Sequence, residues 1–249
     1  MGSYYGRGII LKHEDIREAD RLITIYTWEQ GKLTAVARGA RKISSKLAGS
    51  LEPISNSNLA FVRGRRYDTV TASEVVEPFQ ILKGQLENVW IASSLAELVD
   101  VTTREHVRDT RTYGLLRSSF QLLNGSTVSA RDRALIVWYF VWRQLSFLGY
   151  EPELYACLEC SRRIGGEKVH FSFRGGVVCD RCTGKHQGSR RVSSGVIKLL
   201  RLISSRDRDT LSRIRISSAL ASELNELTSD YLNYTQERDL KLSRIFTRM

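Results

Sequence analysis

The chain has 249 residues, of which 42% are hydrophobic and 26% charged, a composition typical of a protein with a packed core. Thirty-eight basic against twenty-seven acidic side chains give a net charge of +11 and a pI near 9.7, which favours a polyanionic partner. The longest apolar run, 134–142, is too short to cross a bilayer, and no leader-like segment opens the sequence, so we expect a cytoplasmic protein.

Five short segments rich in β-branched residues precede Pro78 and predict strands. They cover residues 8–12, 22–28, 33–38, 58–62 and 69–76. Period-2 alternation predicts that Tyr26 faces one side of its strand while Ile23 and Ile25 face the other. Five short strands with a longer connection after the third, 39–53, favour a small closed barrel of the OB type. Such barrels often carry a helix in that connection, and an SH3-like barrel is the structural alternative.

After Pro78 the apolar period changes to 3.6 residues, which predicts helices. The expected helical segments include 91–99, 116–123, 129–148, 196–203 and 218–234. The third is apolar on most sides, so we expect a central buried helix that ends at Gly149. The fold class is therefore predicted as α+β and multidomain. An OB-fold barrel (1–79) precedes an α-helical domain (80–150 and 189–249) that carries a four-cysteine zinc-binding insertion (151–188).

All four cysteines lie in that insertion, in two C-x2-C pairs separated by eighteen residues. The pairs are Cys157 with Cys160 and Cys179 with Cys182. This spacing predicts a tetrahedral thiolate site for a structural Zn²⁺, since four sulfurs leave no position open for substrate. Unmetallated buried cysteines and two disulfides are the alternatives. We expect the nearby His170 and His186 to lie on the surface.

The sequence contains no motif that predicts catalysis. Phosphate-binding loops, dinucleotide-binding glycine motifs and nucleophile elbows are all missing. Asp15, Glu18 and Asp20 resemble a nuclease metal site, but Arg17 and Arg21 alternate with them, which favours a solvated charged loop. A binding protein that is not an enzyme is the better interpretation.

The positive charge is concentrated in residues 30–67, which hold eight basic side chains and one acid, Glu52. The eight candidate DNA-binding residues are Lys32, Arg38, Arg41, Lys42, Lys46, Arg63, Arg65 and Arg66. Contact with phosphates alone would make binding independent of base sequence. The aromatic residues Tyr26, Trp28, Phe61 and Tyr67 are candidate stacking platforms. The alternative is that Tyr26 and Phe61 belong to the core.

Six segments together resemble the RecO family of bacterial DNA repair proteins. They are 8–11 (GIIL), 18–24 (EADRLIT), 31–42 (GKLTAVARGARK), 74–79 (EVVEPF), 148–154 (LGYEPEL) and 240–246 (LKLSRIF). The resemblance implies an OB-fold, a helical domain with a zinc ribbon, and a recombination mediator associated with the bacterial nucleoid. Such a mediator binds single- and double-stranded DNA and anneals complementary strands.

The resemblance also implies protein partners. Members of this family work with RecR, and with RecF in some settings. They help load RecA onto DNA covered by single-strand binding protein, whose acidic C-terminal tail they contact. The main rival hypothesis is a zinc-ribbon protein that associates with RNA or the ribosome, which would share the charge and the cysteines. A metal-dependent nuclease is the third hypothesis.

Overall fold

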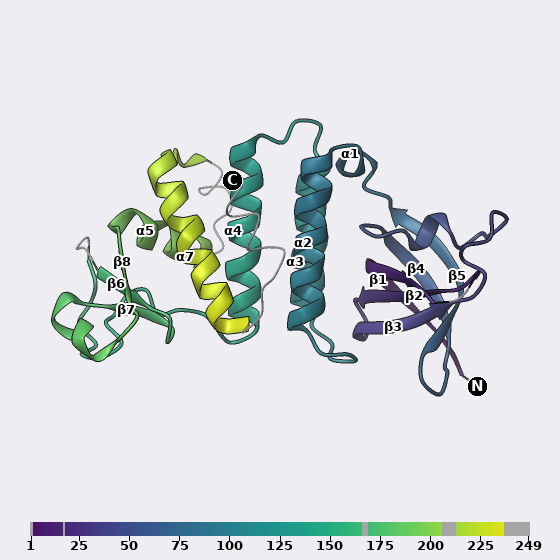
Figure 1. Cartoon of the computed structure of the whole chain (residues 1–249), viewed down its shortest axis with the longest axis horizontal. Coiled ribbons are helices and arrows are strands. Elements are labelled where there is room, and N and C mark those ends of the chain that lie inside the picture. Colours follow the sequence, from purple (N-terminus) through teal and green to yellow (C-terminus); the bar gives the residue numbers. More distant parts are fainter. Residues whose placement is uncertain (1, 17, 166–168, 206–212, 237–249) are drawn as a thin grey trace. The chain divides into compact units, whose positions relative to one another are not determined.

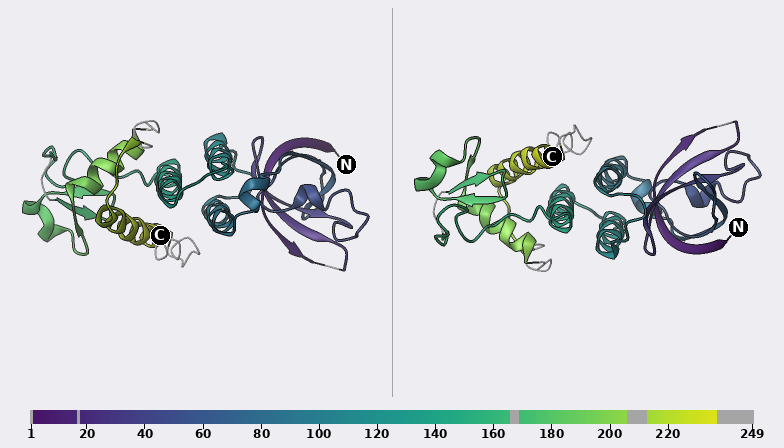
Figure 2. Two further views of the ribbon diagram at one scale, coloured as in Figure 1. Left: turned by 90° about the horizontal axis from the view of Figure 1, so that it is seen from above. Right: turned by 90° about the horizontal axis from the view of Figure 1, so that it is seen from below.

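The structure, a computed structural model, describes residues 2–16, 18–165, 169–205 and 213–236. The chain folds as two compact units, Met1–Ser129 and Ala130–Met249. Figures 1 and 2 show the elements of each unit. Within the described ranges, every helix lacks the length or the apolar content that a bilayer crossing requires. The segment 240–246, which contributes to the family resemblance, lies outside these ranges.

A five-stranded barrel forms the first part of unit 1 (Figure 1). Its strands are β1 (Ser3–Asp15), β2 (Arg21–Thr27), β3 (Gly31–Ala37), β4 (Asn56–Val62) and β5 (Asp68–Glu77). They close in the order β1-β2-β3-β5-β4, with β3 and β5 parallel and the other neighbours antiparallel. The predicted OB-type barrel is confirmed. The connection 39–53 contains only the single 3-10 turn η1 (Gly49–Leu51) where a helix was expected.

The barrel core follows the predicted alternation of β2. Ile23 and Ile25 are fully buried among the inward-facing side chains of the other strands, including Leu33 and Phe61. Tyr26 faces outward but is also fully buried, because the segment that contains Asp109 packs over it. Its hydroxyl donates a hydrogen bond to the carbonyl oxygen of Asp109 at 3.2 Å. The outer side of β2 is therefore a packing surface.

Three helices complete unit 1: α1 (Gln80–Lys83), α2 (Leu86–Thr102) and α3 (Thr110–Leu123). A polar network joins α3 to the barrel. The Arg117 guanidinium donates to both carboxylate oxygens of Glu77, at 2.6 and 2.9 Å. The Tyr113 hydroxyl donates to Asn56, whose amide in turn donates to Glu77. These helices belong to the same compact unit as the barrel. The domain boundary predicted at residue 79 marks instead the point where strands give way to helices along the chain.

Unit 2 combines helices with a small sheet. Its elements are α4 (Ala130–Phe147), β6 (Val169–Ser172), β7 (Gly176–Val178), η2 (Asp180–Lys185), β8 (Arg190–Val192), α5 (Ser194–Ser204) and α7 (Ser218–Gln236). The sheet order is β7-β6-β8. As predicted, α4 is largely buried and is followed by Gly149, whose φ is +89°. Phe171 of the sheet packs against Tyr231, which stacks on Trp142 of α4 at 5.2 Å between ring centroids. The ribbon thus shares an apolar core with the helices.

The Glu77 carboxylate makes the stability of unit 1 dependent on pH. Burial alone would raise the pKa of Glu77, but hydrogen bonds from Arg117, Asn56 and Gln121 outweigh burial and lower it below its ordinary value. A lowered folded-state pKa stabilises the fold above the unfolded pKa of about 4.3, and this stabilisation is lost as pH falls through the folded pKa.

We predict that Glu77→Gln lowers the free energy of unfolding of unit 1 by about 1.5–3 kcal/mol at pH 7. The difference from the wild type should shrink as pH falls from about 4.3 through the lowered folded-state pKa, because the wild-type carboxyl then becomes neutral as well. Urea titrations across this pH range measure it. Glu74→Gln, the same change at an exposed position of β5, is the matched control and should have little effect. A Glu77→Gln deficit that is independent of pH would contradict the role of the charge.

Candidate nucleic-acid interface and metal centre

The four cysteines come together in unit 2. Their sulfur atoms all lie within 4.8 Å of one another. The sulfurs of Cys160 and Cys179 are 3.8 Å apart, which matches the separation of about 3.8 Å between two thiolates bound to one tetrahedral Zn²⁺ at 2.3 Å. A disulfide requires about 2.05 Å, and all four residues are free thiols. The set can therefore hold one metal ion.

Backbone geometry prepares these sulfurs for a cation. The first pair turns back at Ser161, whose N–H donates to the carbonyl of Cys157 at 2.9 Å. The Cys179 N–H donates to the sulfur of Cys157 at 3.4 Å. Burial opposes ionisation of Cys157, but backbone N–H groups from both pairs outweigh it and lower its pKa to about 6. A hydrogen bond with Cys179, together with burial and the nearby sulfurs, raises the pKa of Cys182 to about 12. A divalent ion would offset this mutual repulsion of thiolates.

The prediction that His186 is a surface residue is wrong. Its side chain is only 5% exposed. Its Nε2 is 2.9 Å from the Glu159 carboxylate, and its Nδ1 is 2.9 Å from the Ser172 hydroxyl. His186 therefore links the first cysteine pair to the sheet. His170 is partly exposed, and its Nε2 lies 3.5 Å from the Asp180 carboxylate.

The loop after β3 carries four of the predicted cations. Arg38, Arg41, Lys42 and Lys46 are all exposed. The loop is held to the β1–β2 connection, since the Arg41 N–H donates to the Ala19 carbonyl at 3.0 Å. The Gly39 N–H donates to the Asp20 carboxylate at 2.9 Å. The Asp20 carboxylate thus accepts a hydrogen bond from the backbone of this loop.

Asp15 is also engaged in structure. Its carboxylate lies 3.1 Å from the guanidinium of Arg21 and 3.2 Å from that of Arg41. Among the described residues, only the four cysteines form a cluster of possible ligands close enough to share a metal ion. The acids of the β1–β2 connection therefore belong to a charged loop, in line with the interpretation preferred from sequence.

The β4–β5 loop carries three more exposed cations, Arg63, Arg65 and Arg66. The guanidinium of Arg63 lies 5.8 Å from the ring centroid of Tyr4, and that of Arg66 lies 5.2 Å from the ring of Tyr67. These contacts orient both side chains while leaving them open to solvent. The loop therefore presents fixed positive charge to an approaching polyanion.

Lys32 differs from the other seven cations. Its side chain is only 13% exposed, and its ammonium lies 3.2 Å from the Asp100 carboxylate. The segment between α2 and α3 runs beside it, since the His106 N–H donates to the Lys32 carbonyl at 2.8 Å. Because Lys32 is mostly buried and its charge is paired with Asp100, it does not belong to the candidate interface.

The structure divides the four candidate aromatic residues. Tyr26 and Phe61 are fully buried and belong to the packed interior. Trp28 is 43% exposed, and Tyr67 is half-buried beside Arg66. Burial removes Tyr26 and Phe61 as stacking platforms. Only Trp28 and Tyr67 still present ring surface to solvent.

These features define the class: an OB-fold protein whose helical unit carries a ribbon with four cysteines that could hold one metal ion. Residues 1–79 match the family described as Recombination protein O N terminal, and residues 83–244 match Recombination protein O C terminal. The DNA repair protein RecO of Roseiflexus sp. (strain RS-1) is 34% identical over 95% of this chain and 82% of its own. The same protein of Pelotomaculum thermopropionicum is 31% identical over 97% of this chain and 92% of its own.

The chain belongs to the RecO family, and its role lies in DNA repair and recombination. The resemblance inferred from the six sequence segments is thereby confirmed. The family matches account for nearly the whole length of the chain, including both compact units.

We predict that Cys160→Ser abolishes stoichiometric metal binding. Cys160 is the exposed member of its pair, so this change removes a ligand while leaving the buried core intact. The melting temperature of unit 2 should fall by more than about 5 °C, because metal binding contributes directly to folding. Elemental analysis and thermal unfolding measure both effects. A chelator should lower the wild-type melting temperature to that of the variant and leave the variant unchanged. A wild-type chain that binds no ion and ignores the chelator would contradict the prediction.

Proposed function

We propose that this chain is a recombination mediator that binds single- and double-stranded DNA and anneals complementary strands. The observation that carries the proposal is the set of exposed cations on two loops of one closed barrel. They are Arg38, Arg41, Lys42 and Lys46 after β3 and Arg63, Arg65 and Arg66 between β4 and β5. Membership of the RecO family supports DNA as the polyanion that these side chains bind.

Annealing in this scheme requires no bond chemistry. Lysine and arginine side chains neutralise phosphates on two strands at once, which lowers the repulsion between them and lets complementary bases meet. Because contacts to phosphates carry no sequence information, the activity is independent of sequence. The chain acts by binding and not as an enzyme.

Protein partners complete the proposed role. With RecR, and with RecF in some settings, the chain helps load RecA onto DNA coated by single-strand binding protein. The acidic C-terminal tail of single-strand binding protein suits a chain with a net charge of +11. This work would take place on the bacterial nucleoid in the cytoplasm.

We further propose that the ion in unit 2 is Zn²⁺ with a structural role. Four cysteine sulfurs form the donor set that Zn²⁺ favours and leave no position for a substrate. Cys157, Cys160, Cys179 and Cys182 would hold the ion, and His186 would position the first pair through Glu159. The ion would cross-link the two cysteine pairs. It would not contact DNA directly, because the proposed DNA-binding side chains lie on unit 1.

We predict that the triple variant Lys42→Glu, Lys46→Glu and Arg65→Glu loses at least about tenfold in affinity for single-stranded DNA and anneals poorly. If the wild type contacts about six phosphates, the slope of log K against log salt should be near −4, and the variant should show a shallower slope. Fluorescence anisotropy at several salt concentrations measures affinity. Annealing of DNA precoated with single-strand binding protein measures function.

The control is Arg163→Glu, Arg191→Glu and Lys198→Glu, the same charge change on exposed residues of unit 2. This control should keep most of the affinity. Equal affinity of the wild type and the first triple variant would refute the loop interface. Preference for structured RNA over single-stranded DNA in competition would favour the ribosome-associated alternative, as would failure to capture RecR.

A further inference from the structure

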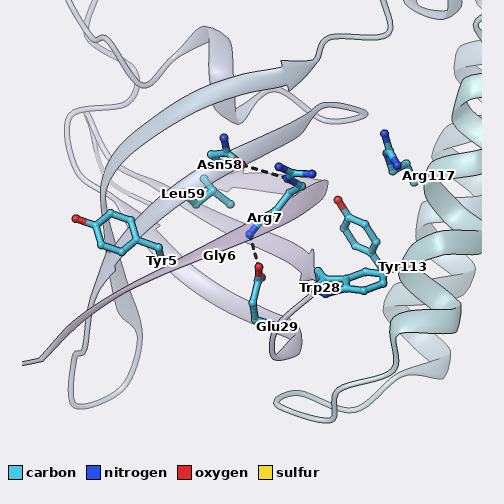
Figure 3. A pocket seen from close by; sticks show the side chains of 9 residues that line it. All are labelled: Tyr5, Gly6, Arg7, Trp28, Glu29, Asn58, Leu59, Tyr113 and Arg117. Atoms are coloured by element: carbon cyan, nitrogen blue, oxygen red, sulfur yellow. Dashed lines mark hydrogen bonds between the residues drawn. The ribbon is translucent and has the colours of Figure 1, made fainter.

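A pocket of about 590 Å³ opens on the outside of unit 1, and none of the eight cations predicted from sequence lines it (Figure 3). β1 contributes Tyr5 and Arg7, the β2–β3 turn contributes Trp28 and Glu29, and β4 contributes Asn58. Tyr113 of α3 forms another part of the wall. Because all of these elements belong to one compact unit, the pocket is a feature of that unit alone.

Aromatic rings line two sides of this pocket. Tyr5 is 79% exposed, so its ring is open to solvent. Trp28 is 43% exposed and meets the buried Tyr113 edge to face, with ring centroids 5.5 Å apart. Figure 3 shows Tyr5 on one side of the pocket and Trp28 with Tyr113 on the other. Exposed aromatic faces are the surfaces on which unstacked nucleobases lie.

The polar groups between these rings are mixed in charge. The Arg7 guanidinium donates to the Asn58 side-chain oxygen at 3.2 Å. The backbone N–H of Arg7 donates to the Glu29 carboxylate at 2.9 Å. A site for phosphate alone would gather cations without a carboxylate. A guanidinium, an amide and a carboxylate together match the donors and acceptors on the edge of a base.

Strand β1 leads from the pocket toward the cationic β4–β5 loop. Tyr5 pairs with Ala60 in the β1–β4 register, and the Arg63 N–H donates to the Gly2 carbonyl at 3.2 Å. The four residue-to-residue steps from Gly2 to Gly6 span roughly 13 Å of extended strand. A polyanion that lies on this loop therefore reaches the pocket along β1. A strand of nucleic acid carries both the phosphates for the loop and the bases for the pocket.

We propose that this pocket receives one unstacked base of a DNA single strand whose phosphates lie on the β4–β5 loop. The inference rests on the proposed DNA-binding function and adds to it a contact with a base. Tyr5 and Trp28 supply stacking surfaces, and Arg7, Asn58 and Glu29 hydrogen-bond to the edge of the base. Single strands are thereby favoured over duplexes, in which every base is paired and stacked.

The test compares two oligonucleotides of about fifteen nucleotides, a length within the reach of one OB barrel. One is oligothymidylate, and the other has the same phosphates but abasic sugars. Oligothymidylate should bind the full-length wild type more tightly and quench the fluorescence of Trp28, which lines the pocket and is exposed. Of the other three tryptophans, Trp138 and Trp142 are buried, and Trp90 is half-buried outside the pocket lining. Tyr5→Ala should weaken oligothymidylate binding about tenfold and leave the abasic affinity unchanged. In Trp28→Phe, the quenching should vanish while most of the affinity remains.

Two further arms separate the alternatives. Tyr155→Ala removes a comparably exposed tyrosine from unit 2 and should change neither affinity. Thymidine monophosphate tests whether a free nucleotide is sufficient, and it should quench Trp28 only at far higher concentration than the oligonucleotide. Equal binding of the thymidylate and abasic oligonucleotides would overturn the inference, as would equal loss of both in Tyr5→Ala. If neither oligonucleotide binds the wild type, the proposed DNA-binding function fails as well.

Discussion

The pairing of β1 with β4, from Ser3 with Val62 to Ile9 with Asn56, closes the amino-terminal barrel. A closed barrel has no free strand edge on which to bind a partner, so its binding groups must lie on loops or on outward-facing side chains. The same pairing sets the β4–β5 loop beside the first residues of β1. It also places the outward-facing residues of β1 and β4 side by side, where the pocket forms.

Charge pairing within unit 1 separates structural cations from available ones. Lys32 lies where the connection between α2 and α3 packs on the barrel, and its ammonium meets the Asp100 carboxylate. A cation that packing removes from water needs such a partner, because an unpaired buried charge is costly. The loop cations stay in water and bear no such requirement. Net charge therefore overstates the binding surface, and burial identifies the side chains that remain for DNA.

In unit 2, the cysteine cluster and an apolar core lie in the same ribbon. Phe171 anchors the small sheet on Trp142 and Tyr231, so the ribbon has support that a thin isolated ribbon would lack. His186 ties Glu159 of the first cysteine pair to Ser172 of the sheet. The histidine links and the aromatic contacts thus meet at adjacent residues of β6, Ser172 and Phe171. This arrangement suits a structural ion whose loss loosens a surface and leaves the helices folded.

Several features of this protein were determined by local sequence alone. Alternation in β2, the 3.6-residue period of α4 and the spacing of the cysteines each depend on residues close in the chain, and each predicted the right element or cluster. The pocket and the burial of His186 and Lys32 depend on contacts between distant segments. Tyr5, Trp28 and Tyr113 are far apart in sequence and form no motif. Only the tertiary structure decided these features, because closure of the barrel and packing of the helices determine which side chains meet and which remain in water.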